Sequence, residues 1–474
     1  MRVLSVTSEA VPLIKTGGLA DVAGSLPQAL KPLGVDMRVL LPAYQGLRKY
    51  LDKKPLWSQS AFFGGEASVH QHIVGDTIFL LLDAPHLFDR EGGPYGNSDG
   101  DYIDNPSRFA ALSQVGALIA EKGLADKWSP DLIHAHDWQA AFSPAYTKLK
   151  GVNVPSVITV HNIAFQGLAP ASQLGALGFS QSDYTADGLE YWGQISSLKA
   201  GLVFADAITT VSPTYAGELK TPQFGMGLDG VIRARASDVH GILNGIDESE
   251  WSPEGTLVEH AYSATKMVGK VKNRKELLAE FGLKKVDGPL AIVVSRLTDQ
   301  KGIDLLAQAL PRFFELGGGL CLLGSGDKTL ENALAQLAGA YPERFGIRIG
   351  YDEALSRRMF AGGDAVLVPS RFEPCGLTQL YGLRFGTLPV VATTGGLADT
   401  VIHANEVAIT SGVATGITFA RIDASGLSDA LDQLVHIFGN KPLWKKMQKN
   451  AMTQPLSWDV SAKKYFELYK RLLT

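Results

Sequence analysis

A six-residue motif with two glycines occurs twice, once near each end of the chain. Thr16-Gly17-Gly18-Leu19-Ala20-Asp21 is repeated letter for letter between Thr394 and Asp399. A glycine before a helix lets the backbone approach a ligand, and the first N–H groups of the helix have no partner within it. With the positive end of the helix dipole, these groups favour a phosphate or an oxygen-rich sugar. One copy is equally consistent with a tight strand-to-helix connection, whereas two copies indicate two α/β halves around a ligand cleft.

The residues beside the two copies carry groups that can bind a ligand. Lys15 precedes the first copy and supplies a positive charge, so Lys15 and Gly18 are candidates for contacting a phosphate. Asp21 falls in the first helical turn, where it either contacts the ligand or complements the helix dipole. The loop from Glu373 to Thr378 precedes the second copy and also ends in small residues before an expected helix.

Two cations share the loop that follows an expected strand at residues 290–295. Arg296 and Lys301 lie in the sequence SRLTDQKG, between this strand and the start of a helix. Arginine can bind two oxygens at once and lysine adds a compact charge, a combination that suits a diphosphate. The alternative is solvated surface charge, which the position at a strand end makes less favourable.

Polar side chains end two further strands. His134-Ala135-His136-Asp137-Trp138 closes one strand and His161-Asn162 closes the next. Because no third ligand follows at a familiar metal spacing, sugar hydroxyls and a sugar face fit these groups better than a metal. Asp99-Gly100-Asp101 matches the Asp-x-Asp of some metal-dependent transferases, but its turn-rich loop favours solvent exposure.

Composition excludes several classes of protein. A net charge of −4 at pH 7 argues against a nucleic-acid surface, and no apolar run approaches the roughly 18 residues of a membrane helix. The two cysteines, Cys321 and Cys375, form neither a disulfide framework nor a metal pattern. We expect a soluble, cytoplasmic protein without a signal peptide. The GMGLDG sequence at residues 225–230 resembles a dinucleotide motif but follows no strand, so it is rejected.

Short β-rich runs alternate with helical patterns, which indicates parallel βαβ units. Strands are predicted at residues 3–7, 37–41, 77–83, 132–135, 156–160, 208–211 and 242–243, then at 290–295, 319–323, 347–350, 365–368 and 389–392. Helices are predicted at residues 106–122, 193–205, 264–281, 303–316, 329–339 and 460–473, and Pro27 is expected to kink or end the first helix. The predicted fold class is α/β, with two doubly wound, Rossmann-like domains facing a deep cleft. Residues 1–240 form the first domain, 241–456 the second, and the last helix, 457–474, packs back on the first.

Eight motifs occur in the order found in bacterial glycogen synthases and plant starch synthases, and the chain resembles this family over essentially its whole length. They are KTGGLADV, HAHDW, HN-x-A-x-QG, ILNGID, SRLT-x-QKG, GYDEA, SRFEPCGLTQ and TGGLADTV. The resemblance implies a GT-B glycosyltransferase that moves glucose, with retention, from ADP-glucose to the non-reducing end of an α-1,4-glucan such as glycogen. It implies no metal and no cofactor. Phe165 replaces a common tyrosine, and Asp352 occupies a variable position.

The resemblance also implies roles for individual residues. The first domain binds the acceptor and the second the nucleotide-sugar. The expected catalytic residues are Arg296, Lys301, Glu373, His161 and Asp137, with the two cations neutralising the leaving diphosphate. The expected nucleotide-sugar contacts are Lys15, Gly18, Asp21, Cys375, the N–H groups of Gly376, Leu377 and Thr378, and Tyr351, which stacks on adenine. The expected glucose or acceptor contacts are Tyr95, Trp138, Asn162 and Asn244.

Three other functions stay open at this stage. The enzyme alternative is a UDP-glucose-dependent or a phosphorolytic relative of the same fold. The residues do not separate ADP from UDP, because a tyrosine can stack on adenine or on uracil. A non-catalytic glucan-binding regulator is less favoured, since every charged candidate is present. Oligomeric state has no signal in the sequence.

Overall fold

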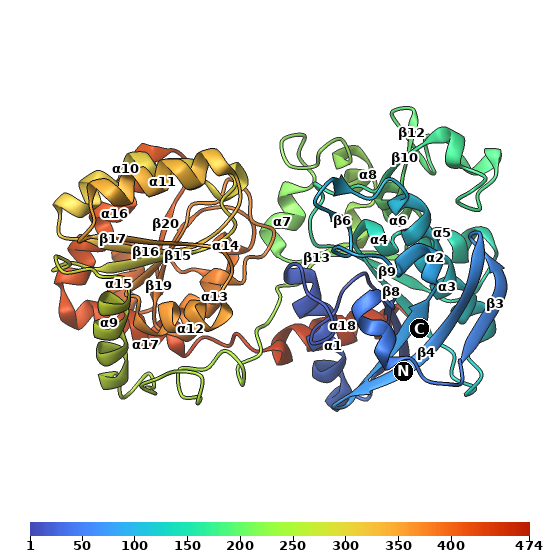
Figure 1. The fold of residues 1–474 in the computed structure, drawn as a ribbon, viewed down its shortest axis with the longest axis horizontal. Coiled ribbons are helices and arrows are strands. Elements are labelled where there is room, and N and C mark those ends of the chain that lie inside the picture. The colour runs from blue at the N-terminus through green and yellow to red at the C-terminus, as the bar shows by residue number, and fades with distance from the viewer. The chain divides into compact units, whose positions relative to one another are not determined.

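The computed structural model describes all residues from 1 to 474, and these form two compact units. The N-terminal unit comprises Met1–Gly245 together with Trp458–Thr474, and the C-terminal unit comprises Ile246–Ser457. Each unit is a sheet with helices on both faces, as the ribbons show (Figure 1). No helix combines the length and the apolar character needed to span a membrane.

A nine-stranded sheet forms the centre of the N-terminal unit. Its strand order is β14-β13-β9-β8-β1-β2-β5-β4-β3, parallel from β14 to β5 and antiparallel at the β4 and β3 edge. The strands are β1 (Arg2–Val6), β2 (Asp36–Pro42), β3 (Trp57–Phe62), β4 (Gly65–Val74), β5 (Thr77–Asp83), β8 (Leu132–His136), β9 (Ser156–Val160), β13 (Ala207–Thr210) and β14 (Val239–Gly241). The strands β8 and β9 are fully buried, as expected for strands covered on both faces.

Nine helices and two small sheets complete this unit. The helices are α1 (Gly18–Leu30), α2 (Pro85–Phe88), α3 (Asn105–Lys122), α4 (Asp137–Ala140), α5 (Phe142–Leu149), α6 (Ser197–Phe204), α7 (Pro213–Glu218), α8 (Asp229–Ala234) and α18 (Trp458–Leu472). The small sheets are β10 (Leu168–Pro170), β12 (Gln194–Ser196) and β11 (Glu190–Tyr191), and the hairpin β6 (Gly96–Asn97) and β7 (Gly100–Asp101).

The C-terminal unit contains a six-stranded parallel sheet in the order β17-β16-β15-β18-β19-β20. The strands are β15 (Leu290–Val294), β16 (Gly319–Gly324), β17 (Phe345–Ile349), β18 (Ala365–Val368), β19 (Leu388–Ala392) and β20 (Ile417–Phe419). The helices are α9 (Val268–Glu280), α10 (Ile303–Glu315), α11 (Lys328–Ala340), α12 (Glu353–Gly362), α13 (Thr378–Arg384), α14 (Gly395–Thr400), α15 (Glu406–Ser411), α16 (Ala424–Gly439) and α17 (Lys441–Met452).

In both sheets the strand order reverses at one point, and ligands bind at such points in doubly wound folds. The reversal lies between β1 and β8 in the N-terminal unit and between β15 and β18 in the C-terminal unit. The loops that follow these four strands begin near Thr7, Asp137, Ser295 and Pro369. All four loops carry residues that the sequence predicts for the site.

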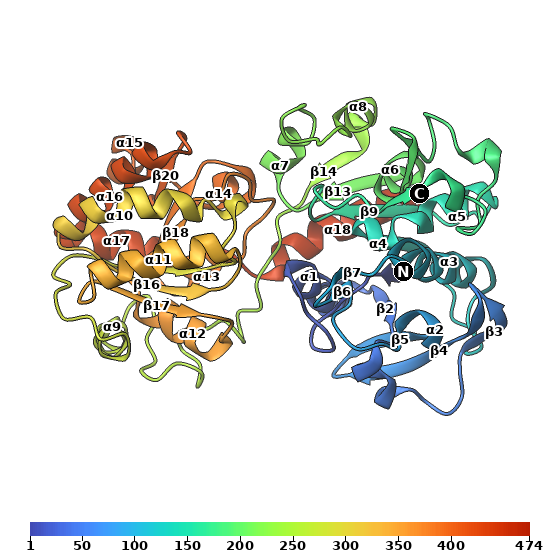
Figure 2. The same cartoon turned by 45° about the horizontal axis from the view of Figure 1, so that its top comes forward.

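The last helix, α18, packs within the N-terminal unit beside α1 (Figure 2). Its buried side chains Trp458, Tyr465 and Tyr469 join a cluster with Val3 of β1 and Leu26 of α1. The Tyr469 hydroxyl lies 2.7 Å from Nδ1 of His134 in β8. The chain thus returns to the unit in which it began.

Several predicted elements are wrong or were missed. The predicted strand at residues 242–243 is instead β14, three residues earlier, and the predicted helix at 193–205 begins only at Ser197, where the Ser196 hydroxyl caps it by accepting the Lys199 N–H at 3.1 Å. Helix α1 continues past the buried Pro27 to Leu30. The edge strand β3 was not predicted, because it is largely exposed and has no continuous apolar pattern, and its neighbour β4 was also missed.

Candidate active site

A pocket opens at the strand reversal of the C-terminal unit. It is lined by the ends of β15 and β18 and by the loops that follow them. Four of the predicted site residues line it, namely Lys301, Glu373, Gly376 and Thr378. Residues as far apart in sequence as Lys301 and Thr378 therefore meet in one place.

A buried ion pair lies in this pocket. The Lys301 ammonium is 2.5 Å from a Glu373 carboxylate oxygen, and the Ser370 hydroxyl donates to the same oxygen at 2.8 Å. Both charged side chains are largely shielded, with 17% and 10% of their surface exposed. A shielded ammonium and carboxylate can act on a sugar diphosphate with little screening by solvent.

The loop that carries Arg296 and Lys301 is held rigidly by its neighbours. Gly302 has a φ of +64°, and a Cβ atom there would lie 2.0 Å from the carbonyl oxygen of Pro369. Arg371 binds both carboxylate oxygens of Asp304 at 2.7 Å. The Arg296 side chain is exposed, while the adjacent Leu297 N–H donates to the Ser325 carbonyl at 2.9 Å. The loop backbone is therefore fixed and the guanidinium reaches outward.

The loop from Glu373 to Thr378 is also well ordered by internal contacts. Gly376 has a φ of +72°, a conformation that favours glycine, and Gln379 donates to the carbonyl oxygens of Cys375 and Gly376 at 2.9 and 2.8 Å. Cys375 is buried, Leu377 occupies the N-cap position of α13 and Thr378 is the first residue of the helix. The N–H groups of Gly376, Leu377 and Thr378 accordingly lie at a helix start beside the pocket.

The second copy of the glycine motif does not present an open helix start, contrary to the prediction. Gly395 and Gly396 are buried, and Cβ atoms there would lie 2.0 Å from the Glu373 carbonyl oxygen and 2.2 Å from that of Cys375. The Gly396 N–H donates to the carbonyl oxygens of Glu373 and Pro374 at 3.1 Å. These glycines serve the close packing of the Glu373 loop. By contrast, a Cβ atom at Gly17 in the first copy would meet nothing within 4 Å.

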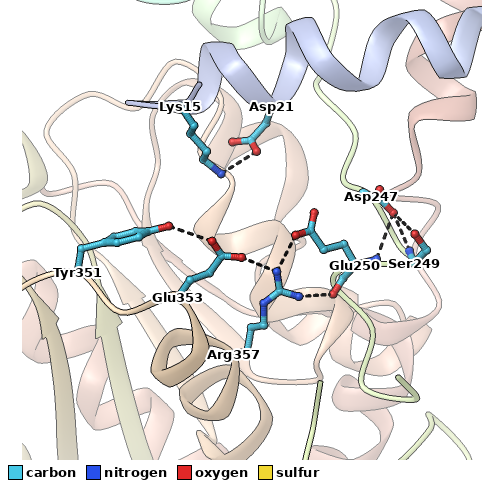
Figure 3. Close-up of polar contacts among 8 residues, drawn as sticks. All are labelled: Lys15, Asp21, Asp247, Ser249, Glu250, Tyr351, Glu353 and Arg357. Carbon is cyan, nitrogen blue, oxygen red and sulfur yellow. Dashed lines mark hydrogen bonds and ion pairs between the residues drawn. The ribbon is translucent and has the colours of Figure 1, made fainter. Parts of the chain in front are cut away.

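Tyr351 follows β17 in the C-terminal unit and 80% of its surface is exposed. Its hydroxyl donates to Glu353 at 3.1 Å, and the other oxygen of Glu353 accepts from Arg357 at 2.5 Å (Figure 3). Arg357 also donates to the backbone and side chain of Glu250, both at 2.7 Å. The Asp247 carboxylate in turn accepts the Ser249 N–H at 2.8 Å. The hydroxyl of the exposed Tyr351 ring is thus linked by hydrogen bonds through Glu353 and Arg357 to Glu250.

The first glycine loop, in the N-terminal unit, is organised by a buried carboxylate that the sequence analysis missed. Glu9 is 3% exposed and accepts from the Thr16 N–H, from the Thr16 hydroxyl at 2.9 Å and from the Gly17 N–H at 3.3 Å. The Tyr95 hydroxyl donates to it at 3.0 Å. The N–H groups of Thr16 and Gly17 are therefore engaged by Glu9, and Gly18 at the start of α1 stays a candidate for the phosphate.

Lys15 and Asp21 pair with each other at 2.7 Å (Figure 3). Asp21 therefore acts on the position of the lysine as well as on the first turn of α1. An acidic residue between the first strand and the glycine motif is the sequence signal that points to Glu9. Ser370, which also went unpredicted, has no such signal.

Asp137 and His161 meet at the ends of β8 and β9. Asp137 has a φ of +53° and accepts the backbone N–H groups of His161 at 2.7 Å and Asn162 at 3.3 Å. The Nε2 atom of His161 lies 3.0 Å from Nδ1 of His136. Burial lowers the pKa of His161 to about 3, so the imidazole is neutral at physiological pH. A neutral imidazole beside a carboxylate can hold sugar hydroxyls by hydrogen bonds.

The other predicted residues of this unit lie in different surroundings. His134 is fully buried and bonded to Thr159 and Tyr469, so it belongs to the core. Trp138 is half-buried, edge-on to Phe109 with ring centres 5.0 Å apart. Asn244 is buried, and its Oδ1 atom has no hydrogen-bond partner. Such an acceptor is suited to a ligand hydroxyl.

Asp137 is expected to make the free energy of unfolding depend on pH. Burial raises its pKa to about 7, against the lowering effect of the His161 and Asn162 N–H groups. Because the unfolded carboxyl titrates near pH 4, its contribution to stability is present below about pH 4 and is lost as the pH rises to about 7. We expect Asp137→Asn to stabilise the protein at about pH 8 by roughly 2–4 kcal/mol, and by less at about pH 5. Asparagine also tolerates the left-handed backbone.

Thermal unfolding at both pH values measures this effect, with Asp131→Asn as the control. The hydrogen bond from Arg2 lowers the pKa of Asp131, so this substitution should instead destabilise the protein at about pH 8. Equal unfolding temperatures for Asp137→Asn and the wild type at about pH 8 would contradict a costly buried charge.

Comparison with known proteins agrees with this architecture. The family described as starch synthase catalytic domain matches residues 2–234, and glycosyl transferases group 1 matches residues 288–436. Glycogen synthase of Cereibacter sphaeroides is 57% identical over 474 residues, covering 100% of this chain and 98% of the relative. Glycogen synthase of Paracoccus denitrificans is 55% identical, covering 99% of each.

Two solved structures are similar to this chain over nearly its whole length. The catalytic domain of starch synthase IV from Arabidopsis thaliana, bound to ADP and acarbose, has a TM-score of 0.89 at 30% identity and covers 100% of this chain and 99% of its own. Sucrose-phosphate synthase from Thermosynechococcus elongatus, with a TM-score of 0.62 at 18% identity, covers 99% of this chain and 98% of its own and shares the fold. The fold is that of GT-B glycosyltransferases, and the chain belongs to the family of glycogen synthases and starch synthases.

Proposed function

We propose that the protein transfers glucose, with retention, from ADP-glucose to the non-reducing 4-OH of an α-1,4-glucan such as glycogen. The observation that carries this proposal is the shielded Lys301–Glu373 pair in a pocket at the strand reversal of the C-terminal unit. The relatives named as glycogen synthases and the starch synthase that holds ADP and acarbose support the choice of donor and acceptor. A cytoplasmic location is part of the proposal, in keeping with a content of only two cysteines.

The two units are assigned different substrates. The C-terminal unit binds the nucleotide-sugar, because it contains the pocket and the exposed Tyr351 ring, on which adenine stacks. The N-terminal unit binds the acceptor, and the Asn244 side chain offers a hydrogen bond to a sugar hydroxyl. Asp137 and His161 hold the glucose unit that is transferred. Trp138 and Asn162 complete this acceptor side, with Tyr95 held next to it by Glu9.

The chemistry is the loss of a diphosphate from a glucose unit that becomes positively charged. Arg296 and Lys301 neutralise the leaving diphosphate, and the N–H groups from Gly376 to Thr378 bind its oxygens. Lys15 and Gly18 supply further contacts from the first glycine loop. Most of the rate enhancement is then electrostatic stabilisation of the leaving group. Retention follows from attack on the side that the diphosphate leaves, with a phosphate oxygen taking the proton of the acceptor hydroxyl.

Incubation with glycogen and radiolabelled nucleotide-glucose tests the proposal. We expect label to enter the polymer from ADP-glucose and much less from UDP-glucose. Preferential incorporation from UDP-glucose, or release of glucose 1-phosphate from glycogen by inorganic phosphate, would assign one of the related activities instead. Binding of glycogen without any transfer of glucose would indicate a non-catalytic glucan-binding regulator.

The reaction is expected to need no metal ion. Asp99 and Asp101, the acidic residues most similar to a metal-binding motif, are exposed in the β6–β7 hairpin. Activity should survive exhaustive treatment with EDTA, and Asp99→Asn together with Asp101→Asn should retain it within about twofold. Loss of activity on chelation that Mg²⁺ or Mn²⁺ restores would refute this prediction.

A further inference from the structure

Three polar side chains are joined by hydrogen bonds across neighbouring strands of the nine-stranded sheet. Ser5 lies in β1, His136 ends β8 and His161 directly follows β9, and these strands are adjacent in the order β9-β8-β1. The Nε2 atom of His136 lies 3.1 Å from the Ser5 Oγ atom, and its Nδ1 atom lies 3.0 Å from Nε2 of His161. Ser5 and His136 are fully buried, whereas His161 is half-buried at the proposed sugar site.

Both imidazoles are neutral at physiological pH. Burial lowers the pKa of His161 to about 3, and burial together with the neighbouring His134 and His161 lowers the pKa of His136 well below its ordinary value. Neither ring is hydrogen-bonded to a carboxylate that would stabilise an imidazolium. A neutral imidazole has one N–H donor and one nitrogen acceptor. The contact between the two rings therefore has one of two directions, and each direction gives both histidines a defined tautomer.

The Ser5 hydroxyl selects the direction. Its one hydrogen bond in the structure is with His136, and the residue is fully buried. If His136 donated to the Ser5 Oγ atom, the serine O–H would be buried without an acceptor, which is unfavourable. In the opposite direction every donor is paired, because the Ser5 O–H donates to Nε2 of His136 and the Nδ1–H of His136 donates to Nε2 of His161. The proton of His161 is then on Nδ1.

The Nδ1–H of His161 is available to a ligand. This nitrogen forms no hydrogen bond within the protein, and the residue is only half-buried. The backbone is held separately, because the backbone N–H of His161 donates to the Asp137 carboxylate at 2.7 Å. With Nε2 accepting from His136 and Nδ1 protonated, the ring has no lone pair left to take a proton. His161 is therefore a hydrogen-bond donor and not a general base.

We propose that Ser5 and His136 are positioning residues that set the tautomer of His161, so that its Nδ1–H donates a hydrogen bond to a hydroxyl oxygen of the transferred glucose. The sugar in this statement rests on the proposed function, whereas the tautomer rests on the contacts of the three side chains. Ser5 acts only through His136, since its hydroxyl is buried. The arrangement agrees with a retaining transfer in which a phosphate oxygen, and not His161, takes the proton of the acceptor hydroxyl.

Nuclear magnetic resonance of the full chain with isotope-labelled histidine tests the tautomer, because the ring-nitrogen shifts distinguish Nδ1–H from Nε2–H. At neutral pH we expect Nδ1–H for His136 and His161, with His136→Asn and His161→Asn assigning the signals. In Ser5→Ala a share of His161 should change to Nε2–H. Ser143→Ala is the matched control, because this buried serine of the same unit donates to the Ser113 carbonyl oxygen at 3.2 Å. An Nε2–H or charged His161 in the wild type, or an unchanged tautomer in Ser5→Ala, would overturn the inference.

Kinetics separate the effect of the tautomer from that of the fold. His136→Asn places a side-chain N–H near the position of the Nδ1–H, whereas His136→Leu removes the donor. We expect the turnover number to fall about tenfold in His136→Leu, the loss of one hydrogen bond to the reacting sugar, and less than about threefold in His136→Asn. The affinity for ADP, measured by titration, should change less than about twofold in both variants, because His136 does not line the pocket of the C-terminal unit.

Thermal unfolding shows which variants are folded. Equal turnover numbers in folded His136→Asn and His136→Leu would refute the positioning role. If His136→Leu does not fold, Ser5→Ala takes its place, and its turnover number should fall severalfold below that of Ser143→Ala. A wild type that transfers no glucose but has the Nδ1–H form of His161 would refute the proposed function and leave the assigned tautomer in place.

Discussion

Lys301→Ala is expected to lower the turnover number by roughly 10²- to 10³-fold, the usual loss when one preorganised charge partner of a transition state is removed. The Lys301 side chain is 17% exposed and its ammonium lies 2.5 Å from Glu373, so solvent screens the charge little. It is therefore well placed to act on negative charge that develops on a leaving diphosphate. Arg296→Ala should have a similar effect, since its guanidinium projects from the same fixed loop.

The control for this prediction is Lys328→Ala. Lys328 also pairs with a glutamate, Glu331, at 2.6 Å in the same unit, but its side chain is 82% exposed. Its removal should change the turnover number by less than about twofold, because exposed ion pairs contribute little. Steady-state kinetics at saturating ADP-glucose, with thermal unfolding to confirm folding, measures both variants. Near wild-type turnover in a folded Lys301→Ala protein would remove the basis for the diphosphate contact.

Tyr469→Ala is expected to destabilise the N-terminal unit by about 3–5 kcal/mol, the typical cost of truncating a buried aromatic side chain. The ring is fully buried among residues of β1, β8 and α1, and its hydroxyl bonds to His134 at 2.7 Å. For a unit of this size the loss corresponds to a fall of roughly 6–20 °C in unfolding temperature.

Two further variants divide this loss into its parts. Tyr469→Phe keeps the ring and leaves Nδ1 of the buried His134 without its partner, which should cost about 1–3 kcal/mol. Lys464→Ala, on the exposed face of the same helix, should stay within about 0.5 kcal/mol of the wild type. Differential scanning calorimetry resolves these shifts. If Tyr469→Ala and Lys464→Ala unfold at the same temperature, α18 does not stabilise the unit.

The local pattern of the chain was sufficient to predict most of the central strands. The buried strands β9 and β18 are short, mostly apolar runs bounded by polar or turn-forming residues, so their positions follow from the local sequence. The edge strand β3 and its neighbour β4 were missed because they become strands only by pairing with each other and, for β4, with β5. The predicted helix at residues 193–205 failed for the same reason, since pairing of β12 with β10 takes its first turn.

The candidate site was likewise predictable only in part from the sequence. The positions of Lys15, Arg296, Lys301 and Asp137 could be predicted because parallel sheets place ligands at the carboxyl ends of their strands. The contacts among the side chains could not be predicted, because they depend on distant parts of the chain. Ser370 illustrates this point, since a serine whose hydroxyl donates to the Glu373 carboxylate is indistinguishable in sequence from any other serine in a loop.

The sequence by itself determined the α/β class of this protein, its membership of a transferase family and the loops that carry its charged residues. Strand pattern, glycine placement and motif order are local properties, and each can be read without knowing what packs against it. Only the tertiary structure decided that the Lys301 ammonium meets Glu373, 72 residues away, and that the second glycine motif is buried. It also decided that His134 belongs to the core while Tyr351 is exposed to solvent. Burial and pairing depend on segments far apart in the chain, and folding alone brings those segments together.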